Sequence, residues 1–316
     1  MSTIEKLRKE YVAVTEKKLR MEIARKMFEK EQDIFEICEF MKDNPCEEIC
    51  IQQDEVYATY DIKGIPIRMG LDKTDMGAVP YTILLKGFYE QPEFDMVMKL
   101  LPYLGENFRV FDVGANLGWY GINIKKRYSD CKVDFFEPVP DTCDRLRKNV
   151  ELNNIKECSV NNIGLSDRAG TMSFFYDTVA SGASSMVNLR EMSTTKQIEV
   201  RMKTMDEYVT DNSVECLDFL KCDVEGAELL VYRGGKKVIA KYQPIIFSEM
   251  LRKWSAKFQY HPNDIIDFLN IMGYQCYVIR NGWLEPFYRV DEDTVETNYF
   301  FLHKEKHSEI IQDLCR

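Results

Sequence analysis

The segment FDVGANLG, residues 111–118, places a glycine-rich turn directly after an apolar strand and before a helical pattern. Its glycines are spaced G-x-x-x-G, whereas a dinucleotide fingerprint reads G-x-G-x-x-G because its middle glycine lets the backbone approach a pyrophosphate. A cofactor without a pyrophosphate, such as S-adenosylmethionine, needs the tight turn but not that glycine. We therefore expect Gly114, Asn116 and Gly118 to contact such a cofactor. Asp112 is expected either to organise the turn or to reach the cofactor's ammonium group.

Acidic and polar residues follow the next two predicted strands. The run KVDFFE (132–137) ends in Glu137, which precedes Pro138 and lies about 20 residues beyond the glycine turn, the spacing at which an acidic side chain binds a ribose diol. Asn162 and the pair Ser166-Asp167 follow the third strand, where we expect the adenine edge. A lone glycine turn is often only a turn, and a lone glutamate at a strand end is usually solvated. Their ordered occurrence at successive strand ends predicts the cofactor site.

Short β-rich runs alternate with helical patterns from Phe108 onward, as in a parallel sheet covered on both faces. We predict an α/β fold with a Rossmann-like, seven-stranded sheet in the methyltransferase variant, and helices on both faces. The predicted strands are 108–113, 132–137, 159–164, 216–224, 244–250, 274–279 and 298–303. The predicted helices are 117–128, 140–152, 204–211, 227–240 and 262–272.

Residues 1–80 are predicted to form an extension of this catalytic domain, which would span residues 81–316. Up to about residue 43, charged residues mix with apolar ones at helical spacing, which predicts one or two amphipathic helices. We favour a packing arm or homodimer contact for them over a lid on the substrate. The run VYATYDIKGIPIRM (56–69) alternates around Lys63-Gly64 and predicts a hairpin that forms part of the acceptor wall.

Composition and charge narrow the function classes. The chain is 45% hydrophobic and 30% charged, without an apolar run of the roughly 18 residues that a membrane helix needs, so no membrane span is expected. The charged N-terminus does not resemble a secretory signal, and the ten cysteines form no C-x-x-C pair, which favours free thiols and a cytoplasmic location. A net charge of −10 disfavours a nucleic-acid partner, because such affinity comes largely from basic residues.

The chain resembles the FkbM family of S-adenosylmethionine-dependent methyltransferases from roughly Gly87 to His303. The shared segments are GFYE (87–90), FDVGANLGWYG (111–121), FFEP (135–138), NNIGLSD (161–167), TMSFFY (171–176) and ASGASSM (180–186). The most specific block is KCDVEGAE (221–228), followed by Tyr232-x-Gly234. The resemblance implies methyl transfer, usually to an oxygen of a sugar, polyketide or other secondary metabolite, and it adds Glu90 to the expected cofactor site. It does not identify the acceptor.

Asp223 is the first candidate for the general base or the acceptor anchor. A hydroxyl acceptor must lose a proton, and Asp223 ends the fourth predicted strand at the edge where the active site is expected. The structural alternative is that Asp223 caps the helix beginning near Glu225. We favour the functional role, because Asp223, Glu225 and Glu228 would repel one another unless a cation lies nearby.

Glu249, at the end of the fifth predicted strand, is the second catalytic candidate. Carboxylates on adjacent strand ends can share a divalent cation that acidifies a hydroxyl, although we do not favour a metal here. His261 is a third candidate base, but a histidine before Pro262 is more often a helix cap or a surface residue. The serine-rich loop at 181–185 is a candidate lid over the methyl donor or a plain connection.

Other functions remain in competition with O-methyl transfer. A nicotinamide oxidoreductase would share the fold, but the missing middle glycine argues against it. A base-modifying nucleic-acid methyltransferase usually carries an Asn/Asp-Pro-Pro-aromatic block where this chain reads DVEG (223–226). A methyltransferase with a nitrogen or carboxyl acceptor and a catalytically inactive binding scaffold are the alternatives that stay open.

Overall fold

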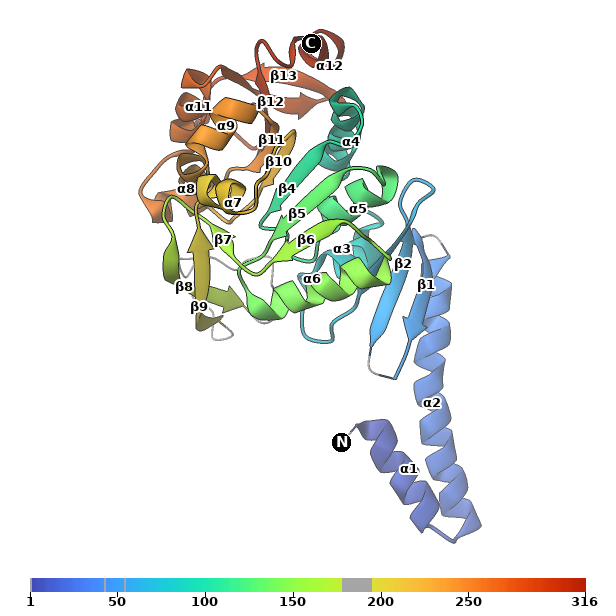
Figure 1. Ribbon diagram of the computed structural model, residues 1–316. Helices are drawn as coiled ribbons and strands as arrows, with labels where there is room; N and C mark the ends of the chain where they lie inside the picture. The colour runs from blue at the N-terminus through green and yellow to red at the C-terminus, as the bar shows by residue number, and fades with distance from the viewer. Residues whose placement is uncertain (1, 43, 54, 178–194) are drawn as a thin grey trace.

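The structure is a computed structural model that describes residues 2–42, 44–53, 55–177 and 195–316. Its body is built on one eight-stranded sheet, and two three-stranded sheets lie beside it (Figure 1). The serine-rich loop at 181–185 that the sequence suggests as a lid lies outside the described residues.

The central sheet has the strand order β13-β12-β14-β11-β10-β4-β5-β6. Strands β6, β5, β4, β10 and β11 are parallel neighbours, and β14, β12 and β13 add antiparallel pairs at one side. All seven predicted strands are confirmed. Their bounds are β4 (Arg109–Val113), β5 (Lys132–Phe136), β6 (Cys158–Asn161), β10 (Phe219–Cys222), β11 (Ile245–Glu249), β12 (Tyr274–Arg280) and β14 (Asn298–His303).

The eighth strand, β13 (Trp283–Phe287), was not predicted from the sequence. It pairs only with β12 in the described sheet, so it is an edge strand. It also contains Pro286. Proline has no backbone N–H to donate to a neighbouring strand, so it is tolerated in an edge strand, which has a neighbour on one side only. The proline weakens the strand pattern in the sequence.

Two hydrophobic clusters, one on each face of the sheet, explain why the strands read as continuous apolar runs. Consecutive residues of β5, Phe135 and Phe136, belong to different clusters, as do Phe219 and Leu220 of β10. Successive strand residues point to opposite faces, so both faces must be covered. The first cluster includes residues of α3 (Val79–Lys86), α4 (Gln91–Leu100), α5 (Trp119–Arg127), α6 (Pro140–Leu152) and α12 (Ser308–Leu314). The second includes residues of α7 (Met205–Asp211), α8 (Glu228–Gly234), α9 (Lys236–Tyr242) and α11 (Pro262–Ile271).

The predicted helix 227–240 is wrong in one respect, because the chain forms two helices, α8 and α9, that meet at Gly235. The chain passes the backbone of Ser166 very closely at this point. A Cβ atom on Gly234 would lie 2.0 Å from the Ser166 carbonyl oxygen. Gly234 therefore serves a close backbone contact, whereas a Cβ atom on Gly235, where the two helices meet, would lie 2.8 Å from the Met205 sulfur. The short α10 (Arg252–Ser255) precedes α11.

The N-terminal segment forms the two predicted helices, α1 (Thr3–Ala13) and α2 (Lys17–Met41), which project from the body as an arm (Figure 1). The predicted hairpin is also present as β2 (Val56–Asp61) and β3 (Pro66–Gly70), with β1 (Cys46–Ile51) as a third, unpredicted strand. This sheet is fastened to α6, because the backbone N–H groups of Arg68 and Gly70 donate to Asn153 and Asn149. Among the described residues, no helix combines the length and apolar character needed to cross a membrane.

The third sheet has the order β7-β9-β8, with bounds β7 (Gly164–Leu165), β8 (Gly170–Asp177) and β9 (Thr195–Lys203). Its β8 contains the predicted strand TMSFFY. Phe174 of β8 and Val139, which precedes α6, share a small apolar cluster. This packing holds Phe174 over the edge of the central sheet where the candidate site lies.

Candidate functional site

An open cavity lies at the carboxyl ends of β4, β5, β10 and β11. This is the edge at which open α/β sheets bind their ligands. Eight of the predicted site residues line it: Glu90, Asp112, Gly114, Asn116, Glu137, Pro138, Asp223 and Glu249. The cavity is also lined by Val79, Tyr89, Ala115, Trp119, Tyr120, Phe174, Lys221, Val224 and Glu225.

The turn after β4 lies very close to the end of β10. Gly114 has φ +70°, and a Cβ atom there would lie 1.7 Å from the Asp223 carbonyl oxygen. Asn116 also takes a left-handed conformation, with φ +48°, and its N–H donates to Glu137 Oε2 at 3.0 Å. The glycine spacing therefore reflects contact between two backbone segments and leaves the backbone of residues 114–116 facing the cavity.

Lys221 connects the two strands beneath this turn. Its buried ammonium donates to the Gly114 carbonyl oxygen at 2.7 Å, and it lies 3.6 Å from Asp112 Oδ1 and 3.4 Å from Asp223 Oδ2. Burial opposes the charge of Lys221, but Asp223 and Asp112 outweigh it and raise the pKa above its ordinary value. Lys221 is thus the cation that the crowded acidic residues of the sequence require.

Asp112 organises the turn, which is one of the two roles expected from the sequence. Its Oδ2 accepts the N–H of Gly121 in the first turn of α5 at 3.0 Å. Burial raises the pKa of Asp112, while Lys221 and the Gly121 N–H act against that rise. Two buried polar atoms of cavity residues, Asp112 Oδ1 and Trp119 Nε1, have no hydrogen-bond partner among the described residues. Of these two atoms, Asp112 Oδ1 faces the Lys221 ammonium at 3.6 Å.

Glu137 lies at the end of β5 with its carboxylate held by the backbone. Its Oε2 accepts the Asn116 N–H at 3.0 Å, and its Oε1 accepts the Val139 N–H at 2.9 Å. Burial raises its pKa to about 7, against the effect of these two bonds. Each oxygen keeps a further lone pair, so the carboxylate can accept two additional hydrogen bonds from a diol in the cavity.

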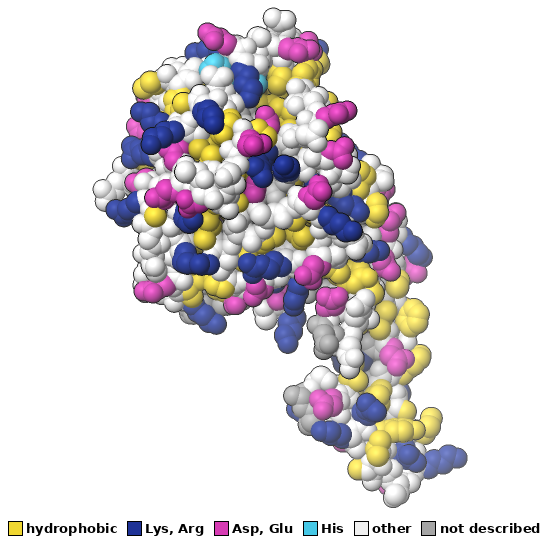
Figure 2. All heavy atoms as spheres, viewed as in Figure 1, with side chains coloured by type: hydrophobic (Ala, Val, Ile, Leu, Met, Phe, Trp, Pro, Cys, Tyr) yellow, Lys and Arg dark blue, Asp and Glu magenta, His cyan; other side chains and the backbone are white. Residues whose placement is uncertain are grey.

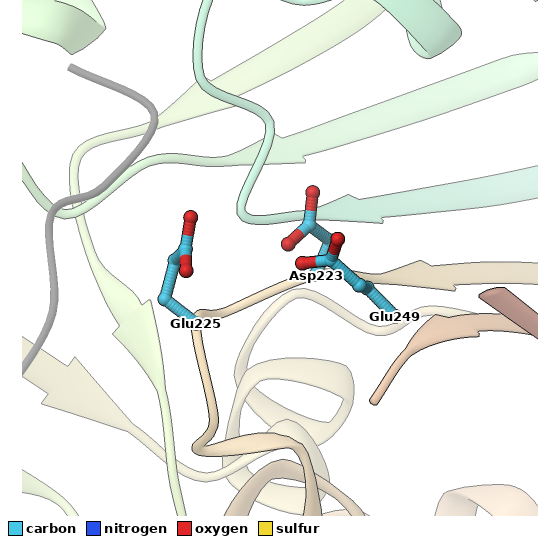
Figure 3. A group of neighbouring side chains, drawn as sticks. All are labelled: Asp223, Glu225 and Glu249. Carbon is cyan, nitrogen blue, oxygen red and sulfur yellow. The ribbon is translucent and has the colours of Figure 1, made fainter. Parts of the chain in front are cut away.

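Three carboxyl groups gather on the other side of the cavity (Figure 3). Asp223, Glu225 and Glu249 each offer an oxygen, and these atoms lie within 4.8 Å of one another. Burial, followed by the charges of Asp223 and Glu225, raises the pKa of Glu249 well above its ordinary value. Asp223 lies 3.4 Å from the Lys221 ammonium, whereas burial and the neighbouring carboxyl groups disfavour the charged form of Glu249. The two carboxyl groups therefore have different electrostatic environments although they are neighbours.

The helix-capping role considered for Asp223 is filled by a different side chain, that of Glu228. The N–H groups of Val224 and Gly226 both donate to Glu228 Oε1, at 3.1 and 3.0 Å. The N-cap residue of α8 is Ala227, which has no side-chain cap. The carboxylate of Glu228 thus satisfies the backbone at the start of α8, and the Asp223 carboxylate lies at the cavity.

Glu90 reaches the cavity from the start of α4, where it adopts φ +46°. The Tyr120 hydroxyl donates to Glu90 Oε2 at 2.7 Å. Burial and the charge of Asp223 raise the pKa of Glu90 to about 7. The GFYE segment thus places a titratable carboxyl group opposite Asp223.

Gly118, Asn162 and His261 do not line the cavity. Gly118 is the N-cap of α5 with φ +85°, and a Cβ atom there would lie 2.4 Å from Leu146 of α6. The Asn162 side-chain amide donates to the carbonyl oxygens of Glu137 and Pro138, both at 3.0 Å. It therefore holds the backbone of the segment that carries the Glu137 carboxylate.

His261 is the exposed N-cap of α11, and its Nδ1 accepts the N–H of Asn263 at 3.2 Å. This is the capping role that the sequence analysis weighed against catalysis. The Ser166-Asp167 pair, expected at the adenine edge, lies against the Gly234 backbone.

Sequence reasoning did not select Lys221, although this residue opens the KCDVEGAE block. Its signal was the pattern itself: a lysine two residues before an aspartate, on an otherwise apolar strand, must be buried and paired. The aromatic residues of the cavity, Tyr89, Trp119, Tyr120 and Phe174, carried no such signal because aromatic residues are common in any core.

The strand order and the cavity at the carboxyl strand ends define the class as a Rossmann-like α/β fold in the methyltransferase variant. Residues 112–276 match the model of the methyltransferase FkbM domain. The chain belongs to the FkbM family of methyltransferases.

Individual relatives agree with this family. Methyltransferase sdnD of Sordaria araneosa is 30% identical over 159 residues, which cover 42% of this chain and 61% of that protein. Hexuronic acid methyltransferase AglP of Haloferax volcanii is 32% identical over 142 residues, which cover 45% and 56% of the two chains. The chain thus spans about three fifths of the length of these curated relatives. A crystal structure of a methyltransferase FkbM from Methylobacillus flagellatus KT is 15% identical, covers 62% of this chain and 43% of that chain, and has a TM-score of 0.40.

Proposed function

We propose that this protein transfers a methyl group from S-adenosylmethionine to a hydroxyl group of a carbohydrate or small metabolite. The observation that carries the proposal is the pairing of two sites in one cavity. Glu137 offers acceptor atoms for a ribose diol, and Asp223 presents a carboxylate beside the buried Lys221 ammonium. One site suits the donor and the other can take the proton that a hydroxyl must lose.

The donor is assigned to the side of the cavity near Glu137. Its ribose would bind the Glu137 carboxylate, and its adenine would enter the adjoining apolar pocket lined by Phe136, Pro138, Leu165, Phe174 and Met202. That pocket shares Gly114, Pro138, Phe174 and Val224 with the main cavity. Asp112 and Trp119 line the part of the cavity that is left for its amino-acid portion. When bound, the donor supplies a methyl group activated by a positively charged sulfur.

Asp223 is the proposed general base. The Lys221 ammonium lies 3.4 Å from its Oδ2 and places a positive charge beside the carboxyl group. The same ammonium balances part of the charge of the Asp223, Glu225 and Glu249 cluster, so we do not propose a requirement for a divalent metal. Orientation of the acceptor oxygen in line with the methyl group would supply much of the remaining rate enhancement.

The proposal is tested by calorimetric titration of S-adenosylmethionine and its demethylated product, with NAD as the control ligand and with or without magnesium. We expect the first two to bind, NAD not to bind, and magnesium to leave the affinity unchanged. Failure of both donor forms to bind would favour a catalytically inactive scaffold. An increase in affinity of tenfold or more with magnesium would instead favour a metal-dependent reaction.

An acceptor screen then separates the remaining alternatives. The relative AglP is named a hexuronic acid methyltransferase, so uronic acids, neutral sugars and small hydroxylated metabolites form the first panel. Amines and free carboxylic acids that carry no hydroxyl group are the matched arms for methyl transfer to nitrogen or to a carboxyl group. Methylation confined to those arms would contradict the hydroxyl acceptor.

Glu137→Gln is expected to weaken donor binding by about 10- to 100-fold, because hydrogen bonds to an ionised group contribute about 1.5–3 kcal/mol. The measurement is calorimetric titration of the donor. Glu207→Gln is the matched control, because Glu207 also accepts a backbone N–H, from Thr204, but lies outside the cavity. Equal affinities for both variants would remove Glu137 from the donor site.

Donor affinity is expected to rise by up to about tenfold between pH 6 and pH 8. The ionised Glu137 accepts hydrogen bonds from a diol, its pKa is about 7, and so the competent form accumulates as the pH rises. Lys221 and Asp112 face Glu137, and Glu90, also with a pKa of about 7, titrates in the same cavity. Glu137→Gln should flatten the profile more than Glu90→Gln does. An unchanged slope in Glu137→Gln would contradict this assignment.

We place the protein in a reducing compartment, the cytoplasm, and expect no nucleic-acid partner. All ten cysteines are free thiols, which supports the first assignment. The net charge of −10 supports the second.

A further inference from the structure

We infer that helix α2 (Lys17–Met41) is a dimerisation surface that binds α2 of a second copy of this chain in antiparallel orientation. The arm formed by α1 and α2 projects from the body, and hydrophobic side chains gather along it (Figure 2). The inference concerns assembly and does not depend on the proposed methyl transfer.

Three of the exposed apolar residues of α2 form a stripe. Met21, Phe28 and Phe35 recur every seven residues, and their exposed fractions are 65%, 59% and 62%. A seven-residue apolar repeat is the pattern by which two helices pack along their length. Ile34, Ile37 and Phe40 are also exposed, but the helical rotation places them on other sides of α2, outside the stripe. Apolar residues that line up on an exposed face commonly mark an interaction site.

Helix α1 packs against a different side of α2. The Arg20 guanidinium lies 4.9 Å from the centre of the Tyr11 ring, and Ile23, one turn further along the same face, is the buried residue of α2. Ile23 is two residues from Met21, which corresponds to a rotation of about 200° around the helix. The intramolecular contact with α1 therefore leaves the stripe exposed.

The charges of α2 favour the second copy as the occupant. Between residues 17 and 26, five of the six charged side chains are basic, and between residues 29 and 39 five of the six are acidic. This order opposes the helix dipole, which prefers acidic residues at the beginning of a helix and basic residues at its end. The charge pattern is therefore not explained by the stability of α2 itself. An antiparallel copy places each basic half against an acidic half.

The shape of α2 fits the same arrangement. A shallow hollow lies between Met21, Ala24 and Phe28, with Lys18, Glu22 and Arg25 at its rim. A two-fold axis near the middle of α2 would bring Phe35 of each copy to the hollow of the other. Such an interface is self-complementary, as a two-fold dimer requires.

Sedimentation velocity of the full chain over a range of concentrations tests the inference. We expect a species of twice the 37.1 kDa mass of one chain, and we expect Phe28→Glu to weaken self-association by on the order of 100-fold. Lys30→Glu is the matched control, because it adds the same side chain on the opposite side of α2. Circular dichroism and donor binding establish that both variants are folded. The inference is overturned if the wild-type chain stays monomeric at all concentrations. It is also overturned if Phe28→Glu self-associates as strongly as the wild type.

A charge exchange tests the orientation. One variant carries Lys17→Glu and Arg20→Glu, so its basic half loses its net positive charge while its other half stays acidic. The other carries Glu36→Lys and Glu39→Lys, so its acidic half loses its net negative charge while its other half stays basic. Each should self-associate at least tenfold more weakly than the wild type, and a mixture of the two should dimerise again. Self-association of either variant at wild-type strength contradicts the antiparallel pairing.

Discussion

Gly114→Ala is expected to lower the free energy of unfolding by about 4 kcal/mol or more, a large part of the total stability of a typical domain. The new Cβ atom would lie 1.7 Å from the Asp223 carbonyl oxygen, a distance that no side-chain adjustment can relieve because both groups belong to the backbone. The turn after β4 would have to separate from the end of β10. The measurement is urea unfolding monitored by circular dichroism.

Gly64→Ala is the matched control for this substitution. Gly64 lies in the turn between β2 and β3 with φ +80°, close to the +70° of Gly114, but a Cβ atom there meets nothing within 4 Å. The control therefore measures only the cost of the left-handed backbone conformation, about 1 kcal/mol. If both variants lost the same stability, the close approach of Gly114 to Asp223 would not be the reason for the glycine.

The sheet could be predicted because its inner parallel strands are buried on both faces. A run such as FRVFDV is largely apolar because it packs against helices on two sides, so its beginning and end are visible in the sequence. Strand β13 lacks this constraint, since it lies at the edge and contains Pro286. The break at Gly235 was missed for a different reason. Gly234 lies against Ser166 and Gly235 against Met205, and both of these neighbours are distant in the sequence and close only in the fold.

The candidate site could be predicted to the extent that it lies at strand ends. Asp112, Glu137, Asp223 and Glu249 each belong to a parallel strand or directly follow one, and such strands end at one edge of the sheet. His261 was selected for its chemistry alone, without such a position, and it caps α11. The partners of each carboxylate could not be predicted, because Lys221 reaches Asp112 and Gly114 only through the pairing of β10 with β4.

Asp223→Asn is expected to lower turnover by about 100- to 10,000-fold on any hydroxyl acceptor found in the screen, the range typical of general acid–base catalysis. The amide has nearly the shape of the carboxylate but cannot take a proton at neutral pH. Donor affinity should change far less, because the donor is assigned to the Glu137 side of the cavity. Turnover and donor titration together separate a loss of chemistry from a loss of binding.

Two matched amide substitutions identify the base. Asp218→Asn changes a carboxylate just before β10, at the opposite edge of the sheet, where it accepts the Arg109 N–H, and it should leave turnover nearly unchanged. Glu249→Gln alters the neighbour of Asp223, and it should cost at most about tenfold because the base is assigned to Asp223 and the amide nearly keeps the shape of the Glu249 carboxyl group beside it. A larger loss in Glu249→Gln than in Asp223→Asn would transfer the role of base to Glu249. Near-normal turnover in both would mean that the acceptor loses its proton to solvent, and that the acidic side of the cavity serves only to bind it.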